Sequence, residues 1–381
     1  MKVTQVETLS CEGGWRIHNF VKISTDEGLV GYSECTMMHS APMLTAAITH
    51  LGSYVIGQDP MNTEAIQLML YGITQRQIGG LAHQAISGLD AALLDIKGKA
   101  LGVPVYQLFG GPVRDRIKVY FTHCGREKPQ RPGLPPALSA KDIPAVWASV
   151  KSCGFTAIKT NPGPDATRTS ESDEPGDISN ATLDHIVAWI GAWRDALGPN
   201  IGIALDVAFL YKMGAILKLA RALEPFRMMW LESESLDPAA LRTVKLSTST
   251  PICIGESFYR TQGFKPYLEQ HALDIIMPDT VWNGITMGKK VADYANTYDI
   301  MFAPHNSHGA LGGLQAVNLC ATLGNFCILE YEYDDMPWRD EIVTHPLVVE
   351  DGAVRIPTRP GLGSDINEEA IRAHPPKVWR A

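Results

Sequence analysis

Residues 201–256 have the sequence IGIALDVAFLYKMGAILKLARALEPFRMMWLESESLDPAALRTVKLSTSTPICIGE, in which three short apolar runs each end in a carboxylate. Acidic or histidine residues follow such runs throughout the second half of the chain, namely Asp206, Glu232, Glu256, Asp279, His305 and Glu330. The intervals between them are 26, 24, 23, 26 and 25 residues, about the length of one strand, one helix and two short loops. If the apolar runs are the strands of a parallel barrel, these side chains surround one end of it.

Eight short apolar runs predict strands that alternate with helices. The runs lie at residues 119–121, 157–158, 201–205, 228–231, 252–254, 275–277, 300–302 and 326–329. Helical patterns separate them, among them residues 183–196, 215–223, 288–298 and 314–323. Because parallel neighbouring strands need helical crossovers, this alternation predicts a parallel α/β barrel.

The N-terminal third has a different pattern, with strands first and helices afterwards. Residues 3–8, 20–25 and 28–35 are rich in β-branched and aromatic residues and predict antiparallel strands. From residue 41 to about 101 the apolar spacing becomes helical, and Gly102 followed by Pro104 predicts the end of the last helix. Strands followed by helices predict a separate α+β domain.

Length and composition narrow the class of protein. A chain of 381 residues suits a barrel of roughly 250 residues with a smaller second domain. Seven scattered cysteines, without a C-x-x-C pair, argue against a disulfide framework or a thiolate metal site. The net charge of -8, without long Lys/Arg clusters, argues against nucleic acid as a partner. Since no stretch resembles a signal peptide or a membrane span, we predict a cytoplasmic protein with no membrane partner.

The carboxylates Asp206, Glu232 and Glu256 end three consecutive predicted strands. Three carboxylates from adjacent strands form an all-oxygen site that suits Mg²⁺ and leaves room for water or substrate. Each carboxylate alone would more often cap the following helix or join an ion pair. That alternative explains three in succession poorly.

The next three residues of the series suggest acid–base chemistry. Asp279 and His305 end neighbouring predicted strands, so the carboxylate can orient the imidazole and raise its basicity. His308 is a nearby competitor for this role. Glu330, among other carboxylates and partly buried, would keep a raised pKa and donate a hydrogen bond to a developing oxyanion. Glu332 is an alternative, because alternate strand residues point the same way.

The second predicted strand ends in Lys159-Thr160-Asn161. Lys159 would offset the carboxylates and stabilise negative charge on a substrate, or it is an ordinary surface lysine. Two long connections, 126–142 and 162–179, are rich in proline or in small and polar residues. Long connections of this kind are lids, substrate loops or plain surface loops.

The chain resembles the mandelate racemase subgroup of the enolase superfamily over nearly its full length. The resemblance includes residues 85–90 (AISGLD), 95–100 (DIKGKA) and 360–363 (PGLG). It implies a modified TIM barrel, (β/α)7β, over residues 118–331 with an N-terminal α+β capping domain over residues 1–117. Residues 332–381 would return to complete the cap. The resemblance also implies a homo-oligomer.

The resemblance assigns roles to the series as well. It implies a Mg²⁺ site at Asp206, Glu232 and Glu256, a dyad of His305 with Asp279, and an oxyanion-stabilising Glu330.

Three departures from the family pattern bear on the reaction. Many members have Lys-x-Lys on the second strand, where the second lysine is a base, but here Asn161 takes that position. The Lys-x-Asn form is similar to that of galactonate dehydratases, which however have a second histidine where this chain has Ala208. Glu232-Ser233-Glu234 replaces the usual Glu-Glu-Pro and makes Glu234 an alternative metal ligand. An acid–base group on only one face of the reacting carbon favours elimination over racemisation.

We therefore predict a Mg²⁺-dependent dehydratase, a hydro-lyase acting on an acid sugar (an aldonate or aldarate). His305 would remove the proton α to the carboxylate, and loss of the β-hydroxyl would give a 2-keto-3-deoxy acid. The general acid stays open between His305 itself, Tyr211 and His123. The alternatives are a cycloisomerase of an acid-sugar lactone, a racemase or epimerase, and a non-catalytic barrel of the same fold.

Substrate selection is expected from the cap and the long loops. The turn between the first two strands, with Trp15, Arg16, His18 and Asn19, resembles the mobile cap loop of this family. Arg126 and Arg168 would reach a distal hydroxyl or a second carboxylate. The predicted substrate contacts are Trp15, Arg16, His18, Asn161, Arg168, His308 and Glu332.

Overall fold

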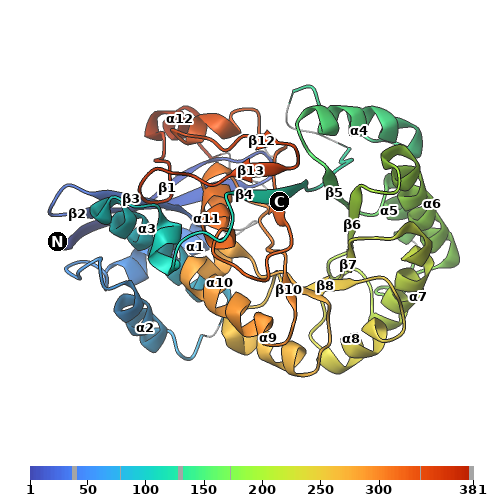
Figure 1. The fold of residues 1–381 in the computed structure, drawn as a ribbon, viewed down its shortest axis with the longest axis horizontal. Coiled ribbons are helices and arrows are strands. Elements are labelled where there is room, and N and C mark those ends of the chain that lie inside the picture. The colour runs from blue at the N-terminus through green and yellow to red at the C-terminus, as the bar shows by residue number, and fades with distance from the viewer. Residues whose placement is uncertain (37–40, 78, 128–131, 172, 335, 377–381) are drawn as a thin grey trace.

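The computed structural model describes residues 1–36, 41–77, 79–127, 132–171, 173–334 and 336–376. Strands and helices of the N-terminal third form a cap at one side of the molecule, and the alternating strands and helices of the rest form a ring beside it (Figure 1). The C-terminal elements lie next to both parts.

Among its described residues the cap contains one antiparallel sheet followed by three helices, which confirms the predicted order of strands and then helices. The sheet has the order β1 (Val3–Glu12), β2 (Ile17–Thr25), β3 (Val30–Glu34), and the helices are α1 (Ala41–Gly52), α2 (Thr63–Ile73) and α3 (Gly80–Leu101). Helix α3 ends at Gly102, whose φ of 69° is left-handed and suits a residue without a side chain. The helix end predicted at Gly102 is therefore confirmed.

Eight parallel strands form the ring. They are β4 (Arg116–Phe121), β5 (Ala157–Thr160), β6 (Gly202–Asp206), β7 (Trp230–Glu232), β8 (Ile252–Ile254), β9 (Ile275–Ile276), β10 (Met301–Phe302) and β11 (Leu329–Tyr331). Strands β4 to β10 pair in chain order, and β11 pairs back with β4. The Cys327 amide donates to the Phe302 carbonyl at 2.8 Å, which joins β10 to the segment entering β11. The predicted barrel architecture is confirmed, although the last strand begins three residues later than expected.

Helices surround these strands (Figure 1). They are α4 (Ile143–Ser152), α5 (Pro164–Ser170), α6 (Asn180–Leu197), α7 (Met213–Leu223), α8 (Pro238–Lys245), α9 (Arg260–Glu269), α10 (Thr280–Asn296) and α11 (Ala310–Cys320), with short 3-10 turns η1 (Val105–Phe109), η2 (Ala140–Asp142), η3 (Glu224–Phe226) and η4 (Arg339–Ile342). Helix α5 lies inside the connection 162–179 that was predicted as a loop. Pro164 opens it at a position where proline is well tolerated, and Ala166 buries one face.

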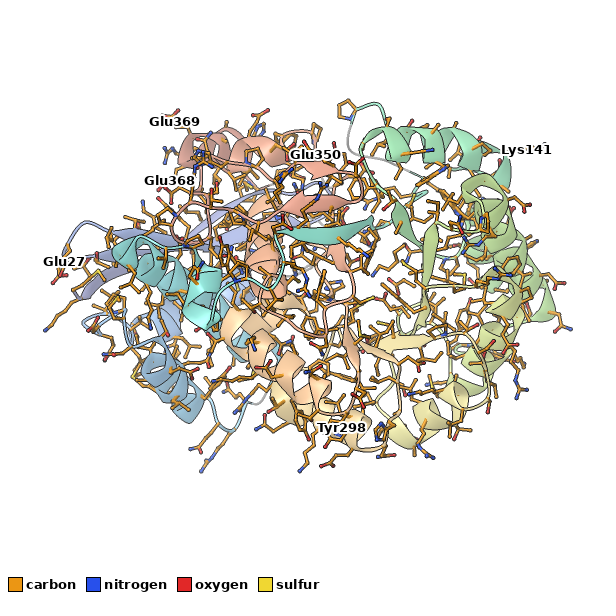
Figure 2. The ribbon with its side chains drawn as sticks, viewed as in Figure 1. Glu27, Lys141, Tyr298, Glu350, Glu368 and Glu369 are labelled. Carbon is orange, nitrogen blue, oxygen red and sulfur yellow. The ribbon has the colours of Figure 1, made fainter. Side chains whose placement is uncertain are left out.

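Side chains fill the inside of the ring, as Figure 2 shows. A buried cluster there includes Ala204, Trp230, Met277 and Ala303. Each of these residues stands two positions before a member of the polar series, and alternate strand residues face the same side. The apolar layer therefore closes one end of the ring and leaves the polar layer at the other.

The C-terminal segment contacts both the barrel and the cap. It contains β12 (Val349–Glu350), β13 (Ala353–Arg355) and α12 (Glu368–Ala373). Strand β13 pairs antiparallel with β4. Glu368, labelled beside the cap in Figure 2, accepts hydrogen bonds from Lys22 at 2.7 Å and from the Tyr32 hydroxyl at 3.0 Å. None of the helices among the described residues is long and apolar enough to cross a membrane.

Candidate active site

The carboxyl end of the barrel gathers the five carboxylates of the series around two cationic groups, Lys159 and His305. Lys159, at the end of β5, is the first of them. Its Nζ lies 2.8 Å from Glu330 Oε1 and 3.1 Å from both carboxylate oxygens of Glu232. Asp206 Oδ2 is 3.8 Å away. Lys159 is buried, so it is not the surface lysine of the alternative interpretation.

His305, which follows β10, is the second cationic group. Its Nδ1 lies 2.5 Å from Asp279 Oδ2, and its Nε2 lies 3.3 Å from Glu256 Oε2 and 3.7 Å from Glu330 Oε2. Burial opposes the charge on this imidazole, but Glu330, Glu256 and Asp279 together raise its pKa to about 10. Through Lys159 and His305, all six residues belong to one connected cluster.

The cluster carries more negative than positive charge. Burial raises the pKa of Glu232 well above its usual range and Asp206 adds to the shift, although Lys159 opposes it. Burial also raises the pKa of Glu256, with His305 opposing and Asp206 adding. Such shifts arise where carboxylates share a site without enough cations.

This donor set fits a divalent cation. Asp206, Glu232 and Glu256 offer only oxygen, the donor that Mg²⁺ prefers, and a cation among them would offset the excess charge. In this structure their oxygens are joined through Lys159 and His305 rather than gathered around one point. Glu234 does not add a further carboxylate to this donor set. Its Oε1 accepts the Gly255 amide at 2.7 Å and so supports the turn before Glu256.

Among the described residues, one group of three has potential ligand atoms within 4.8 Å of one another, and it is Asp279, His305 and His308. Both imidazoles bond the same carboxylate oxygen, at 2.5 Å from His305 and 2.7 Å from His308. These short contacts use the atoms that a metal would need. We therefore interpret the group as a hydrogen-bonded triad.

The two carboxylate oxygens of Asp279 have different partners. Its Oδ1 caps α10 by accepting the amides of Val281 at 2.8 Å and Trp282 at 2.6 Å. Its Oδ2 holds the two imidazoles. Burial would raise the pKa of Asp279, but His308 and His305 hold it below its ordinary value. Asp279 therefore bonds His305 as predicted, and it also caps a helix, a role that was not predicted for this residue.

The predicted raised pKa of Glu330 is wrong. Burial does act in that direction, but Lys159 and then His305 outweigh it, and the pKa falls to about 2. Glu330 also accepts hydrogen bonds from the Thr122 hydroxyl and from the Asn306 amide. It is therefore an ionised acceptor that holds Lys159 and His305, not a proton donor.

Glu332 is fully buried and connects three loops. Its Oε2 lies 2.9 Å from His123 Nδ1 and accepts the Ser307 hydroxyl at 2.9 Å, and its Oε1 accepts Arg126 Nη2 at 2.9 Å. Arg16 Nη2 lies 3.8 Å away. Burial opposes ionisation, but Arg126 and His123 hold the pKa of Glu332 well below its usual range. Since both oxygens bind protein groups, the predicted substrate contact is not what this structure shows.

The loop between β1 and β2 divides into two parts. Arg16 is buried, donates to the Ser307 carbonyl and hydroxyl, and stacks 3.5 Å from the Trp15 ring. These two residues therefore lie at the edge of the site. His18 and Asn19 point elsewhere: His18 is fully buried with Nδ1 3.0 Å from Glu34 Oε1, and Asn19 accepts the Ser10 hydroxyl.

The remaining candidates differ in position. His308 is fully buried, and its Nε2 lies 2.7 Å from Asp279 Oδ2. Asn161 is exposed, donates to the Asp206 carbonyl, and lines a cavity of about 220 Å³ together with Arg126. Arg168 lies on α5 with 61% of its side chain exposed and pairs with Asp165, which is not a member of the cluster. Tyr211 packs in the main hydrophobic core.

Several residues at the site were not predicted from the sequence. Thr122 was detectable, because it stands two residues after Tyr120 on the inward face of β4. Trp282, whose ring centroid is 5.6 Å from that of His305, and Ser307 carried no recognisable signal.

Comparisons with known proteins agree with this arrangement. A family profile described as Enolase C-terminal domain-like matches residues 144–370, and the profile of the mandelate racemase / muconate lactonizing enzyme N-terminal domain matches residues 16–110. The chain belongs to the mandelate racemase / muconate lactonizing enzyme family of the enolase superfamily. The resemblance seen in its sequence is confirmed.

Similar proteins match along their whole length. The D-galactonate dehydratase of Pectobacterium atrosepticum is 33% identical over 100% of this chain and 96% of its own. The D-xylonate dehydratase of Haloferax volcanii is 31% identical over 98% of this chain and 89% of its own. A solved structure from Burkholderia xenovorans, provisionally named an L-alanine-DL-glutamate epimerase and bound to magnesium and fumarate, is 36% identical with a TM-score of 0.93, covering 99% of this chain and 97% of that one.

Proposed function

We propose that the protein is a Mg²⁺-dependent acid-sugar dehydratase, a hydro-lyase that converts an aldonate or aldarate into a 2-keto-3-deoxy acid. One observation carries the proposal: the His305 imidazole is oriented by buried Asp279 and presents Nε2 to a cluster of carboxylates. The names of the similar dehydratases support the substrate class.

In this proposal Asp206, Glu232 and Glu256 hold the cation. Bound there, Mg²⁺ would bind the substrate carboxylate, make the neighbouring C–H more acidic, and reduce the negative charge that keeps His305 protonated. The excess of carboxylates over cationic groups in the cluster supports this assignment.

The chain's own residues supply the proton transfer. Neutral His305 removes the α-proton through Nε2, while Asp279 keeps the other nitrogen protonated and the ring fixed. The Lys159 ammonium stabilises the negative charge that develops on the substrate oxygens. Glu330 holds both groups in place through its contacts at 2.8 Å and 3.7 Å.

The test is incubation of the enzyme with Mg²⁺ in D₂O against a panel of aldonic acids, aldaric acids and their lactones. We expect one or a few acids to yield a 2-keto acid that carries deuterium. A His305→Asn variant should keep its circular dichroism spectrum and lose about 10²–10⁴-fold in kcat. Full turnover by this variant, or no product from any acid sugar, would overturn the proposal.

An epimerase is the second candidate, because the similar Burkholderia xenovorans structure bears that provisional name. Epimerisation needs an acid–base group on both faces of the carbon, and the amide of Asn161 is not a base. The same experiment separates the two: an epimerase exchanges the α-proton and inverts the carbon without forming a keto acid. A cycloisomerase would give product from a lactone by expelling the ring oxygen, and would give none from the open-chain acid.

A further inference from the structure

A second histidine–carboxylate pair lies at the barrel mouth, formed by His123 and Glu332. The His123 Nδ1 is 2.9 Å from Glu332 Oε2, and the carboxylate is fully buried while the imidazole is 25% exposed. The arrangement repeats that of His305 with Asp279, where Nδ1 also meets a buried carboxylate. A carboxylate at Nδ1 fixes the ring and leaves Nε2 for chemistry.

The backbone turns His123 toward the mouth. Thr122, the residue before it, faces the inside of the barrel and donates to Glu330. Strand alternation would point His123 outward. Its φ of 50° interrupts that alternation and brings the ring to Glu332. Such a conformation is uncommon for residues other than glycine, and strained residues cluster at functional sites.

The surroundings of His123 leave one nitrogen for a ligand. Glu332 occupies Nδ1, and the Trp15 ring packs edge-on with a centroid distance of 5.7 Å. Within the described part of the chain, Nε2 has no hydrogen-bond partner. The ring is therefore held on two sides while Nε2, on a partly exposed side chain, remains open.

His123 lies one side-chain layer beyond His305. Glu330 lies on β11 and Glu332 directly follows that strand, two residues or about 7 Å further along the chain, and they contact His305 and His123 respectively. Ser307, two residues after His305, also donates to Glu332. A bound substrate with its carboxylate in the cluster and its hydroxylated carbons extending toward the cap would therefore reach both imidazoles.

We propose that His123 is the general acid that protonates the departing β-hydroxyl, and that Glu332 positions it. The inference rests on the proposed dehydratase function. The Nε2 proton passes to the hydroxyl oxygen, the C–O bond breaks with its electron pair, and water leaves. The electrons of the enediolate form the new carbon–carbon double bond, and the resulting enol takes up a proton at carbon 3 to become the keto acid. His123 regains its proton from solvent, and His305 returns the one that it removed.

The experiment measures two steps separately in D₂O with the full-length enzyme. For the wild type, a His123→Asn variant and a His123→Gln variant, it follows α-proton exchange in recovered substrate and formation of keto acid. We expect both variants to retain exchange and to lose about 100-fold or more in keto acid formation. His50→Asn, at an exposed position on α1, is the matched control and should behave as wild type.

A substrate analogue with fluorine in place of the β-hydroxyl distinguishes acid catalysis from a structural role. Fluoride leaves without full protonation, so the His123 variants should process the analogue within about 10-fold of wild type. The Glu332→Asp variant should show an intermediate loss of dehydration with the same rescue. Such a pattern would support a positioning role for Glu332.

The outcomes are distinguishable. If wild type acts on an acid sugar and a His123 variant dehydrates it at the wild-type rate, this inference is overturned and the dehydratase proposal stands. A folded variant that loses exchange, dehydration and fluoride elimination together would also overturn it. If wild type gives neither exchange nor keto acid with any acid sugar, the dehydratase proposal falls and this inference falls with it.

Discussion

Glu232 and Glu332 are both buried carboxylates at the barrel mouth, but their surroundings are opposite. Glu232 shares one ammonium, Lys159, with other carboxylates, and its pKa is raised well above the usual range by burial and by Asp206. Glu332 faces the guanidinium of Arg126 and the imidazole of His123, which hold its pKa well below that range despite burial.

The difference shows how one residue type can serve two purposes. Around Glu232 the negative charge is incompletely balanced, so the site suits a cation from outside the chain. Around Glu332 the protein supplies the cations itself, and the carboxylate fixes the loops that bear them. The first two of the following changes test the two sides of this comparison, and the other two extend it to another buried carboxylate and to an exposed ion pair.

Removal of the divalent cation should have the largest effect. Chelation with EDTA is expected to abolish turnover, and added Mg²⁺ should restore it. Mg²⁺ at 100 times its Kd should also stabilise the fold by about 2.7 kcal/mol, measured as a rise in Tm. Changing residues that merely support metal ligands lowers affinity about 10–100-fold, so Glu232→Gln should lower it at least as much. Undiminished turnover after chelation would contradict the cation site.

Glu332→Gln should come next, because it leaves Arg16 and Arg126 without their shared carboxylate. Breaking a buried ion pair from one side destabilises proteins by about 3–5 kcal/mol, and urea denaturation would measure the loss. The control is Glu350→Gln, at an exposed residue labelled in Figure 2, which should change stability by less than about 0.5 kcal/mol. Equal stability of the two variants would contradict the loop-fixing role of Glu332.

Asp90 supplies a third case, a buried carboxylate on α3 whose side-chain hydrogen-bond partner is Thr286. Burial raises its pKa to about 7, so the folded state binds this proton more tightly than the unfolded state does. Stability from this group is therefore present at low pH and falls as the pH rises from about 4 to 7, by at most about 1.4 kcal/mol per unit. Asp90→Asn should remove that slope from denaturation curves recorded between pH 4 and 8. An unchanged slope would assign the pH dependence to other groups.

The smallest effect is expected for Arg168→Ala. The Arg168 and Asp165 side chains are 61% and 60% exposed, and exposed ion pairs contribute about 0–1 kcal/mol. Steady-state kinetics should give kcat and KM within about 2-fold of wild type. A large increase in KM would show instead that Arg168 reaches the substrate, as its sequence context first indicated.

Much of the fold was predictable because its signals are local. The apolar runs and their intervals located the barrel strands, and the glycine after α3 located the end of that helix. The missed helix α5 is short, with 7 residues, and its sequence is mostly polar, so it gave no periodic signal. The position of the six polar residues at one end of the barrel follows from parallel pairing alone.

The charge states were not predictable in the same way. Glu330 was expected to hold a proton because it lies among carboxylates, but its nearest charged neighbour is Lys159, from a strand far away in the sequence. His308 was expected to contact a substrate, and in the structure it is fully buried and bonds the Asp279 oxygen that His305 also bonds. These outcomes depend on distances of a few ångströms between distant segments, which a sequence does not contain.

The sequence by itself thus determined the ring of strands and the six residues of the series at its mouth, because spacing along the chain dictates which side chains end parallel strands, and its motifs indicated the family. The tertiary structure alone decided which carboxylates are balanced and which are not, and it alone brought His123 to Glu332. Coulombic interactions and burial act through space, so residues that look equivalent along the chain acquire opposite charge states in the fold.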